Sequence, residues 1–154
     1  MDMKLKTLGD EDIGILYDWL CKRHVRQFFG DPKEWIREIK CNRISSDWIH
    51  YFLVDVNNAS IGFVQYYETK KAPQGIWSDE PEGTVGIDYL IGEESYLYRG
   101  YGNDIVREII VIIRQTNNYR FVIADPDIKN PASVSVLINN GFIIQKSGLF
   151  KLML

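Results

Sequence analysis

Residues 86–116 constrain the fold of this chain more than any other stretch. They begin with an alternating β-type run, continue through a polar connection with two close glycines, and end in a long apolar run at helical spacing. In the run 84–91, Asp88 falls on the face opposite the apolar side chains, because side chains alternate along a strand. The order strand, glycine loop, helix predicts an α/β (mixed) fold, with a helix that begins between Gly100 and Asn103.

The glycine loop has the chemistry of a phosphate site. A helix start carries unpaired backbone N–H groups and the positive end of the helix dipole, and glycines allow a close approach of the backbone. The G-K-[ST] pattern of a nucleotide-binding P-loop is missing, and so is the three-glycine dinucleotide fingerprint. A lone G-x-G before a helix is most often only a tight connection. Motifs in the neighbouring sequence must therefore show whether this loop binds a phosphate.

Two ordered motifs resemble the GNAT acetyltransferases. L-Y-R-G-Y-G at 97–102 is similar to that family's coenzyme A pyrophosphate loop, Q/R-x-x-G-x-G/A, although Leu97 departs from its first position. D-P at 125–126, N-P-A at 130–132 and N-G-F at 140–142 resemble a second family segment at the expected spacing. G-I-D-Y-L-I-G at 86–92 and H-V-R-Q-F-F-G at 24–30 look like the aminoglycoside 6'-N-acetyltransferase group. The resemblance covers about residues 5–142.

The resemblance implies a GNAT-like central mixed sheet of about six to seven strands flanked by about four helices, with acetyl-CoA as cosubstrate. Local patterns predict strands at 4–8, 48–56, 60–68, 121–124, 142–145 and 149–154, and helices after Gly9, from Pro32 and from Pro131. The aromatic pair Phe28 and Phe29 falls in a predicted connection before Pro32. There the rings either stack on a substrate ring or fill the gap between two helices.

Composition narrows the class of protein. With 154 residues, 45% of them hydrophobic, the chain is expected to form a single domain over residues 1–154. A net charge of −3 argues against nucleic-acid binding. The absence of a signal-peptide pattern and of a bilayer-length apolar run predicts a cytoplasmic protein with no membrane partner. Cys21 and Cys41 are expected to be reduced thiols, and His24 and His50 have no partners at metal-ligand spacing, so no metal is predicted.

Acidic residues gather around the central strand. Residues 72–98 contain no Lys or Arg, and they include Asp79, Glu80, Glu82, Asp88, Glu93 and Glu94. Such a patch favours a cationic small molecule as substrate. The alternative is a solvated acidic loop that only keeps the protein soluble.

Acetyl transfer to an amine requires a group that holds or deprotonates the amine, and Asp88 is the candidate for that role. The alternative is an Asp that forms a structural ion pair with a nearby Arg. A parallel crossover from 84–91 to 121–124 would open both strand ends on one side, so Asp88 and Asp125 are expected to approach a common cleft. Asp125 is predicted to bind a second amino group, although it is equally suited to be a turn residue before Pro126.

The remaining site residues follow mostly from the resemblance. The pyrophosphate is expected on the backbone of the glycine loop, pantetheine on the strand edge, and a further contact at Asn130, which is alternatively only a helix cap. The complete predicted cofactor set is Leu90, Ile91, Arg99, Gly100, Tyr101, Gly102, Asn103, Asp104 and Asn130. The predicted acceptor set is Asp125, Asp79, Glu80, Gln65, Tyr66, Phe28 and Trp77.

One position departs from the family pattern. Many members carry a tyrosine in Y-x-x-x-G-F that can protonate the leaving thiolate, and this chain has Leu137 there. The thiolate then leaves unprotonated, or Tyr96, Tyr98 or Tyr101 substitutes. The predicted function is 6'-N-acetylation of an aminoglycoside. The alternatives are acetylation of another small amine, such as a hydroxylamino acid of siderophore synthesis or a polyamine, and a coenzyme A-binding module without turnover.

Overall fold

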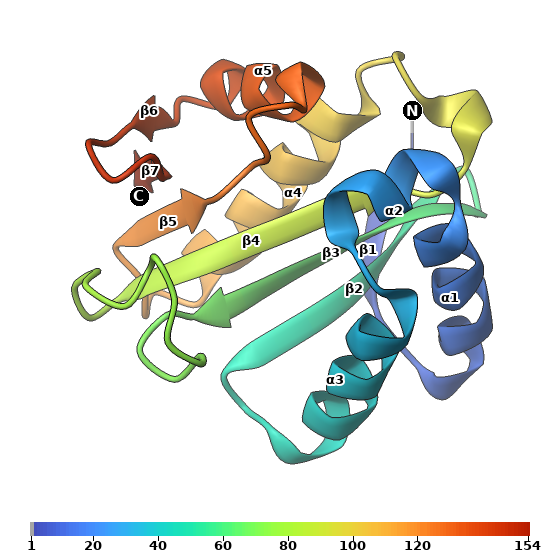
Figure 1. Cartoon of the computed structure of the whole chain (residues 1–154), viewed down its shortest axis with the longest axis horizontal. Helices are drawn as coiled ribbons and strands as arrows, with labels where there is room; N and C mark the ends of the chain where they lie inside the picture. The colour runs from blue at the N-terminus through green and yellow to red at the C-terminus, as the bar shows by residue number, and fades with distance from the viewer. Residues whose placement is uncertain (1) are drawn as a thin grey trace.

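The computed structural model describes residues 2–154, and its centre is one seven-stranded sheet (Figure 1). The spatial order is β1-β2-β3-β4-β5-β7-β6, with β4 and β5 parallel and every other neighbouring pair antiparallel. The mixed sheet expected from the sequence is confirmed. The strands are β1 (Met3–Thr7), β2 (Ile49–Val56), β3 (Ala59–Glu68), β4 (Thr84–Ile91), β5 (Phe121–Ala124), β6 (Ile143–Ile144) and β7 (Phe150–Met153).

Helices cover both faces of the sheet (Figure 1). They are α1 (Ile13–Cys21), α2 (Arg23–Phe29), α3 (Pro32–Ser45), α4 (Tyr101–Gln115) and α5 (Pro131–Asn139), with 3-10 turns at Asp10–Asp12 and Glu94–Tyr96. The first three pack on one face, where Leu16, Trp19 and Ile39 meet Leu53 and Phe63. Helix α4 covers the other face. Within residues 2–154, no helix has the length and apolar character needed to cross a membrane.

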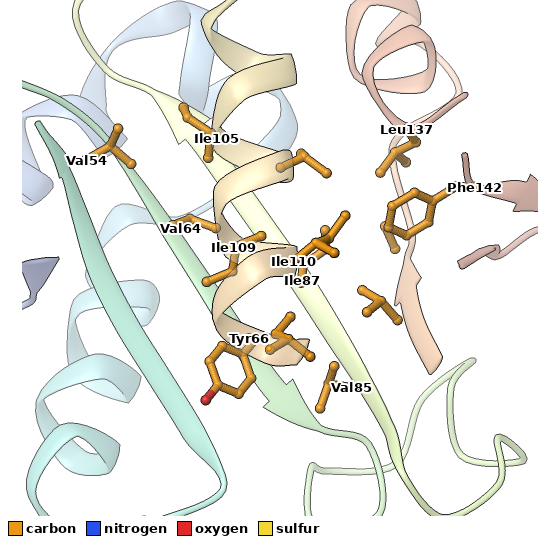
Figure 2. Close-up of a cluster of buried hydrophobic side chains, with 14 of the residues drawn as sticks. Val54, Val64, Tyr66, Val85, Ile87, Ile105, Ile109, Ile110, Leu137 and Phe142 are labelled. Carbon is orange, nitrogen blue, oxygen red and sulfur yellow. The ribbon is translucent and has the colours of Figure 1, made fainter. Parts of the chain in front are cut away.

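The α4 face holds the larger hydrophobic core (Figure 2). Ile105, Ile109 and Ile110 of α4 lie against Val64 and Ile87 of the sheet, as the helical spacing of the apolar run predicts. Leu90 belongs to the opposite cluster, under α1 and α3. Strand β4 therefore alternates as predicted, and Asp88 lies on the side of α1–α3 rather than that of α4.

Helix α2 was not predicted, so the number of helices is five rather than about four. Phe28 and Phe29 lie in its last turn, and the prediction that they stand in a connection is wrong. The helix has seven residues and buries only Val25, which is too little periodicity to recognise. Tertiary contacts hold it instead: Lys22 Nζ donates to the Gly92 carbonyl at 3.2 Å, and His24 Nε2 lies 2.9 Å from the Ile91 carbonyl oxygen.

Strand β4 separates from β5 halfway along its length. Three residue pairs join them, from Thr84–Phe121 to Gly86–Ile123, and β5 ends at Ala124. Figure 1 shows the chain leaving β5 toward α5 while β4 continues. Within residues 2–154, the Ile87–Ile91 edge of β4 has no strand beside it on that side. This separation leaves room for a site between β4 and α5.

Gly92 closes the end of β4 against Trp19. A methyl group at Gly92 would overlap the fully buried Trp19 ring, whose Nε1 donates to Glu93 Oε2 at 2.5 Å. We expect Gly92→Ala to lower the free energy of unfolding by about 1–3 kcal/mol, because an overpacked core must shift. Unfolding in denaturant measures this change in free energy. Gly14→Ala is the matched control, since no neighbouring atom lies within 4 Å of the added methyl. Equal stability of the two variants would contradict this packing.

Candidate active site

Asp88 lies at the middle of β4, opposite Gln65 of β3 in the strand register. The buried Gln65 donates from Nε2 to Asp88 Oδ2 at 2.9 Å. Within residues 2–154, Asp88 takes part in no ion pair. The alternative of a structural pair with an arginine therefore finds no support. The carboxylate keeps an oxygen that Gln65 does not engage.

Burial raises the pKa of the Asp88 carboxyl above its ordinary value, and the negative charge of Asp125 raises it further, while the Gln65 hydrogen bond acts in the opposite direction. A carboxylate with a raised pKa binds a proton more tightly. It is therefore a better general base toward an ammonium group than an exposed Asp.

The acidic cavity, with a volume of about 140 Å³, lies beside Asp88. As predicted, Asp88 and Asp125 line one cavity, and Asp127 joins them. Burial, followed by the neighbouring charge of Asp127, raises the pKa of Asp125. The full lining is Phe28, Phe29, Trp35, Ile87, Asp88, Tyr89, Ala124, Asp125, Pro126, Asp127, Asn130, Ser133 and Leu137. Acidic groups and aromatic walls together suit a cation with an apolar body.

The loop cavity, of about 300 Å³, lies between the β4 edge, the start of α4 and α5. Gly100 precedes α4 with φ +85°, a conformation that favours glycine, and Gly102 is buried in the first turn. A methyl group at Gly102 would lie 3.1 Å from Val136 Cγ2, so the loop and α5 are in close contact. Of the predicted cofactor residues, Leu90, Ile91, Gly100, Tyr101, Gly102, Asn103 and Asn130 line this cavity.

Two predicted cofactor residues are absent from that lining. The exposed Arg99 guanidinium lies near the rings of Tyr96 and Tyr101, at 5.6 and 5.7 Å from their centroids. Asp104 pairs with Arg107 at 2.7 Å. Asn130 caps α5 through a hydrogen bond from the Ser133 N–H at 3.3 Å, and it lines both cavities as well. Asn130 can therefore cap α5 and also contact a ligand.

The two cavities meet. Five residues belong to the linings of both cavities, namely Phe28, Phe29, Tyr89, Asn130 and Ser133. A group that enters the loop cavity can therefore reach a group in the acidic cavity. Among described residues, no group of three or more potential metal ligands lies together.

The predicted acidic patch is not continuous. Asp79 and Glu80 precede β4, whereas Glu93 and Glu94 follow it, and eight extended residues separate the two ends by about 26 Å. Glu80 pairs with Lys151 at 2.8 Å, and neither Asp79 nor Glu80 lines the acidic cavity. The prediction that residues 79–94 form one surface is wrong, because the extended strand β4 holds the two acidic groups apart.

Tyr66 and Trp77 also lie elsewhere than predicted. Tyr66 is buried in the core under α4, on the opposite face from Asp88, so the prediction that it contacts the substrate is wrong. Trp77 packs edge-on against Tyr67 with centroids 5.8 Å apart and does not line the acidic cavity. Tyr67 was missed, although alternation from Gln65 places it on the Asp88 side. Its ring lies over Gly86, and burial, with smaller effects of Asp88 and Asp125, raises its pKa.

Comparison with known families decides the class of protein. The family model described as an acetyltransferase (GNAT) domain matches residues 9–150. The chain belongs to the GNAT acetyltransferases. Acetyl-CoA is accordingly the acetyl donor, and the glycine loop at the start of α4 fits the pyrophosphate that the family motif binds. The resemblance found in the sequence is confirmed.

Individual relatives are distant. An aminoglycoside N(6')-acetyltransferase type 1 of Klebsiella pneumoniae is 23% identical over 145 residues, covering 90% of this chain and 72% of the relative. An N-hydroxyputrescine acetyltransferase of Acinetobacter baumannii is 19% identical over 119 residues, covering 76% of this chain and 57% of the relative. The crystal structure of an aminoglycoside acetyltransferase with coenzyme A and kanamycin has a TM-score of 0.86 at 20% identity, covering 99% and 95% of the two chains. This likeness shows a shared fold.

The loop cavity can be tested through Gly102. Gly102→Val should weaken coenzyme A binding more than tenfold, because a side chain there presses on Val136 and on the Tyr89 ring and so displaces the loop that lines the cavity. Calorimetric titration gives the affinity, and a melting curve of the same sample reports whether the variant is folded. A folded variant with unchanged affinity would remove the loop from the coenzyme A site.

Asp88→Asn tests the carboxylate. We expect turnover to fall by about 10²- to 10⁴-fold with coenzyme A affinity unchanged, since general-base assistance is lost while size is kept. In the wild type, the rate should decline as pH falls through the raised pKa of Asp88, and this limb should vanish in the variant. Asp55→Asn is the matched control, because Asp55 also accepts a hydrogen bond on a strand, from Ser60 Oγ at 2.8 Å, away from both cavities. Near-normal turnover of Asp88→Asn would exclude the catalytic role.

Proposed function

We propose that this enzyme acetylates a polycationic amino sugar, with the 6'-amino group of an aminoglycoside as the favoured acceptor. The observation that carries the proposal is the acidic cavity, in which Asp88, Asp125 and Asp127 face one space that is continuous with the loop cavity. Three carboxylates there attract an acceptor with several ammonium groups. The names of the Klebsiella pneumoniae relative and of the kanamycin complex favour the same acceptor.

The residues divide the work of acetyl transfer. The acceptor amine enters the acidic cavity as an ammonium ion and gives a proton to Asp88, directly or through water. Its nitrogen then attacks the thioester carbonyl carbon, the C–N bond forms, and the C–S bond breaks with its electron pair passing to sulfur. The second amine proton leaves to solvent. Asp125 and Asp127 hold a further ammonium group and so orient the acceptor.

The aromatic walls give the acceptor its second recognition element. Phe28, Phe29 and Trp35 line the acidic cavity, and Phe29 and Trp35 are in contact with ring centroids 5.1 Å apart. Trp35 Nε1 donates to the Phe29 carbonyl at 2.7 Å, which fixes the indole orientation. The apolar face of a sugar ring packs well on such a surface, and ammonium groups are attracted to aromatic faces.

A linear polyamine is the second candidate acceptor. Its cationic ends and methylene chain match carboxylates set among aromatic rings, and the relative from Acinetobacter baumannii is named as an N-hydroxyputrescine acetyltransferase, after an N-hydroxylated linear diamine. A thiol-release assay with acetyl-CoA and a panel of aminoglycosides, polyamines, hydroxylamino acids and monoamines separates these acceptors. Turnover confined to linear amines would replace the aminoglycoside proposal. No turnover with any amine would favour a coenzyme A-binding module. If the enzyme acetylates aminoglycosides, its expression in a sensitive bacterium should raise the antibiotic concentration that is needed to inhibit growth.

Asp125→Asn separates polycations from simple amines. Loss of its charge should raise the Michaelis constant for a polycationic acceptor about tenfold or more, while a monoamine acceptor is little affected. The difference should shrink as salt rises, because screening weakens attraction between partly exposed charges. Asp18→Asn is the control, since Asp18 is exposed on α1 outside both cavities. An equal effect of Asp125→Asn on both acceptor classes would contradict the binding role.

A further inference from the structure

The Phe28 ring of α2 stands apart from the hydrophobic core. In the part of the chain that the structure describes, it belongs to neither buried cluster and to no aromatic pair. Its neighbour Phe29 packs with the cluster under α1 and α3, where its ring meets Trp35. Core packing therefore accounts for Phe29, whereas the position of Phe28 is accounted for by the two cavities that it lines.

The junction of the two cavities has apolar and polar lining residues from different helices. Helix α2 supplies Phe28 and Phe29, and α5 supplies Asn130 and Ser133. The acyl group on coenzyme A must lie at this junction, because the amine that attacks it is held in the acidic cavity. Its carbonyl oxygen suits the polar residues of α5, and its hydrocarbon end suits the rings of α2.

Helix α2 holds the Phe28 ring in a defined place. Lys22 Nζ and His24 Nε2 join the helix to carbonyl oxygens at the end of β4, at 3.2 and 2.9 Å. A helix that is anchored in this way yields little to a larger group, because a packed element has to shift as a unit. An acetyl group ends in a single methyl, whereas each further methylene of a longer acyl chain has to find space beside the ring.

We propose that the Phe28 ring sets the length of the transferred acyl group, so that acetyl is accepted and longer acyl chains are excluded. The inference rests on the acetyl transfer proposed above, and it concerns the donor rather than the acceptor. A longer chain at the junction meets the ring, and it fits only if the thioester carbonyl moves away from the amine. The reacting atoms must approach to about 3–3.5 Å, so this displacement lowers the rate as well as the affinity.

Donor binding tests this role without any acceptor. Calorimetry gives the affinities of acetyl-CoA and butyryl-CoA, and the wild type should bind butyryl-CoA about tenfold or more weakly, because its two further methylenes meet the ring. Phe28→Ala should remove most of this difference. Phe52→Ala is the matched control, since it deletes a phenylalanine ring outside both cavities and should keep the wild-type difference. Equal affinities in the wild type, or a difference that survives Phe28→Ala, would overturn the proposal.

Turnover gives the second measurement. With an acceptor that the wild type acetylates, the ratio of kcat/KM for butyryl-CoA to kcat/KM for acetyl-CoA should rise about tenfold or more in Phe28→Ala. Both donors are compared with the same acceptor, so a change in acceptor binding cancels in the ratio. An unchanged ratio would contradict the proposal, and if Phe28→Ala is misfolded, Phe28→Leu should shift the ratio less far in the same direction. A wild type that is inactive with every amine, yet shows the affinity difference, would support the role of Phe28 and refute only the acceptor assignment.

Discussion

The separation of β4 from β5 is the constraint on which the whole site depends. Parallel strands can be joined only through a crossover, and α4 provides it here, so the glycine loop must begin where β4 ends. Because β5 ends after four residues, α5 is placed beside the continuing edge of β4 rather than beyond it. Both cavities are lined from this region, by Tyr89 of β4 and by Asn130 and Ser133 at the start of α5. A longer pairing of the two strands would close this space.

The acidic cavity carries a cost in stability. Asp88 is withdrawn from water with a hydrogen bond from Gln65 and no cation in the described chain, so its folded-state pKa lies above its unfolded value. The folded state then binds more protons than the unfolded state, and stability falls as pH rises from the unfolded pKa through the raised folded one. At neutral pH this residue opposes folding. A carboxylate that opposes folding fits a functional role better than a structural one.

The sequence was sufficient where a local rule controls the outcome. The glycine loop, the α4 helix and the alternation that places Asp88 opposite the apolar face follow from spacing alone, and the structure confirms them. Asn57 and Asn58 adopt positive φ in the β2–β3 turn, as their side chains allow. The roles of the residues that bind the acceptor and coenzyme A stay predictions, because they concern ligands rather than the chain.

Errors arose where tertiary contacts decide. Helix α2 is held by bonds from Lys22 and His24 to the end of β4, which no local pattern encodes. The acidic residues before and after β4 are close in sequence but stand at opposite ends of an extended strand. The wrong prediction of Tyr66 did not arise from a tertiary contact. Side-chain alternation from Gln65 already shows that Tyr67, and not Tyr66, shares the face of Asp88.

The same alternation divides the chemistry of the site between two neighbouring residues. Asp88 faces α1–α3 and the acidic cavity, while Tyr89 faces α4 and reaches the glycine loop. A carboxylate and a phenol are thereby held on opposite faces of one strand, with its free edge between them. Neither group can bond to the other in this arrangement. Tyr67 of β3 is a phenol on the face of Asp88, but its ring lies over Gly86, and the hydrogen bond to the carboxylate comes from Gln65. A hydrogen bond from a phenol would lower the proton affinity of Asp88, so this arrangement keeps the carboxylate as basic as its proposed role toward the amine requires.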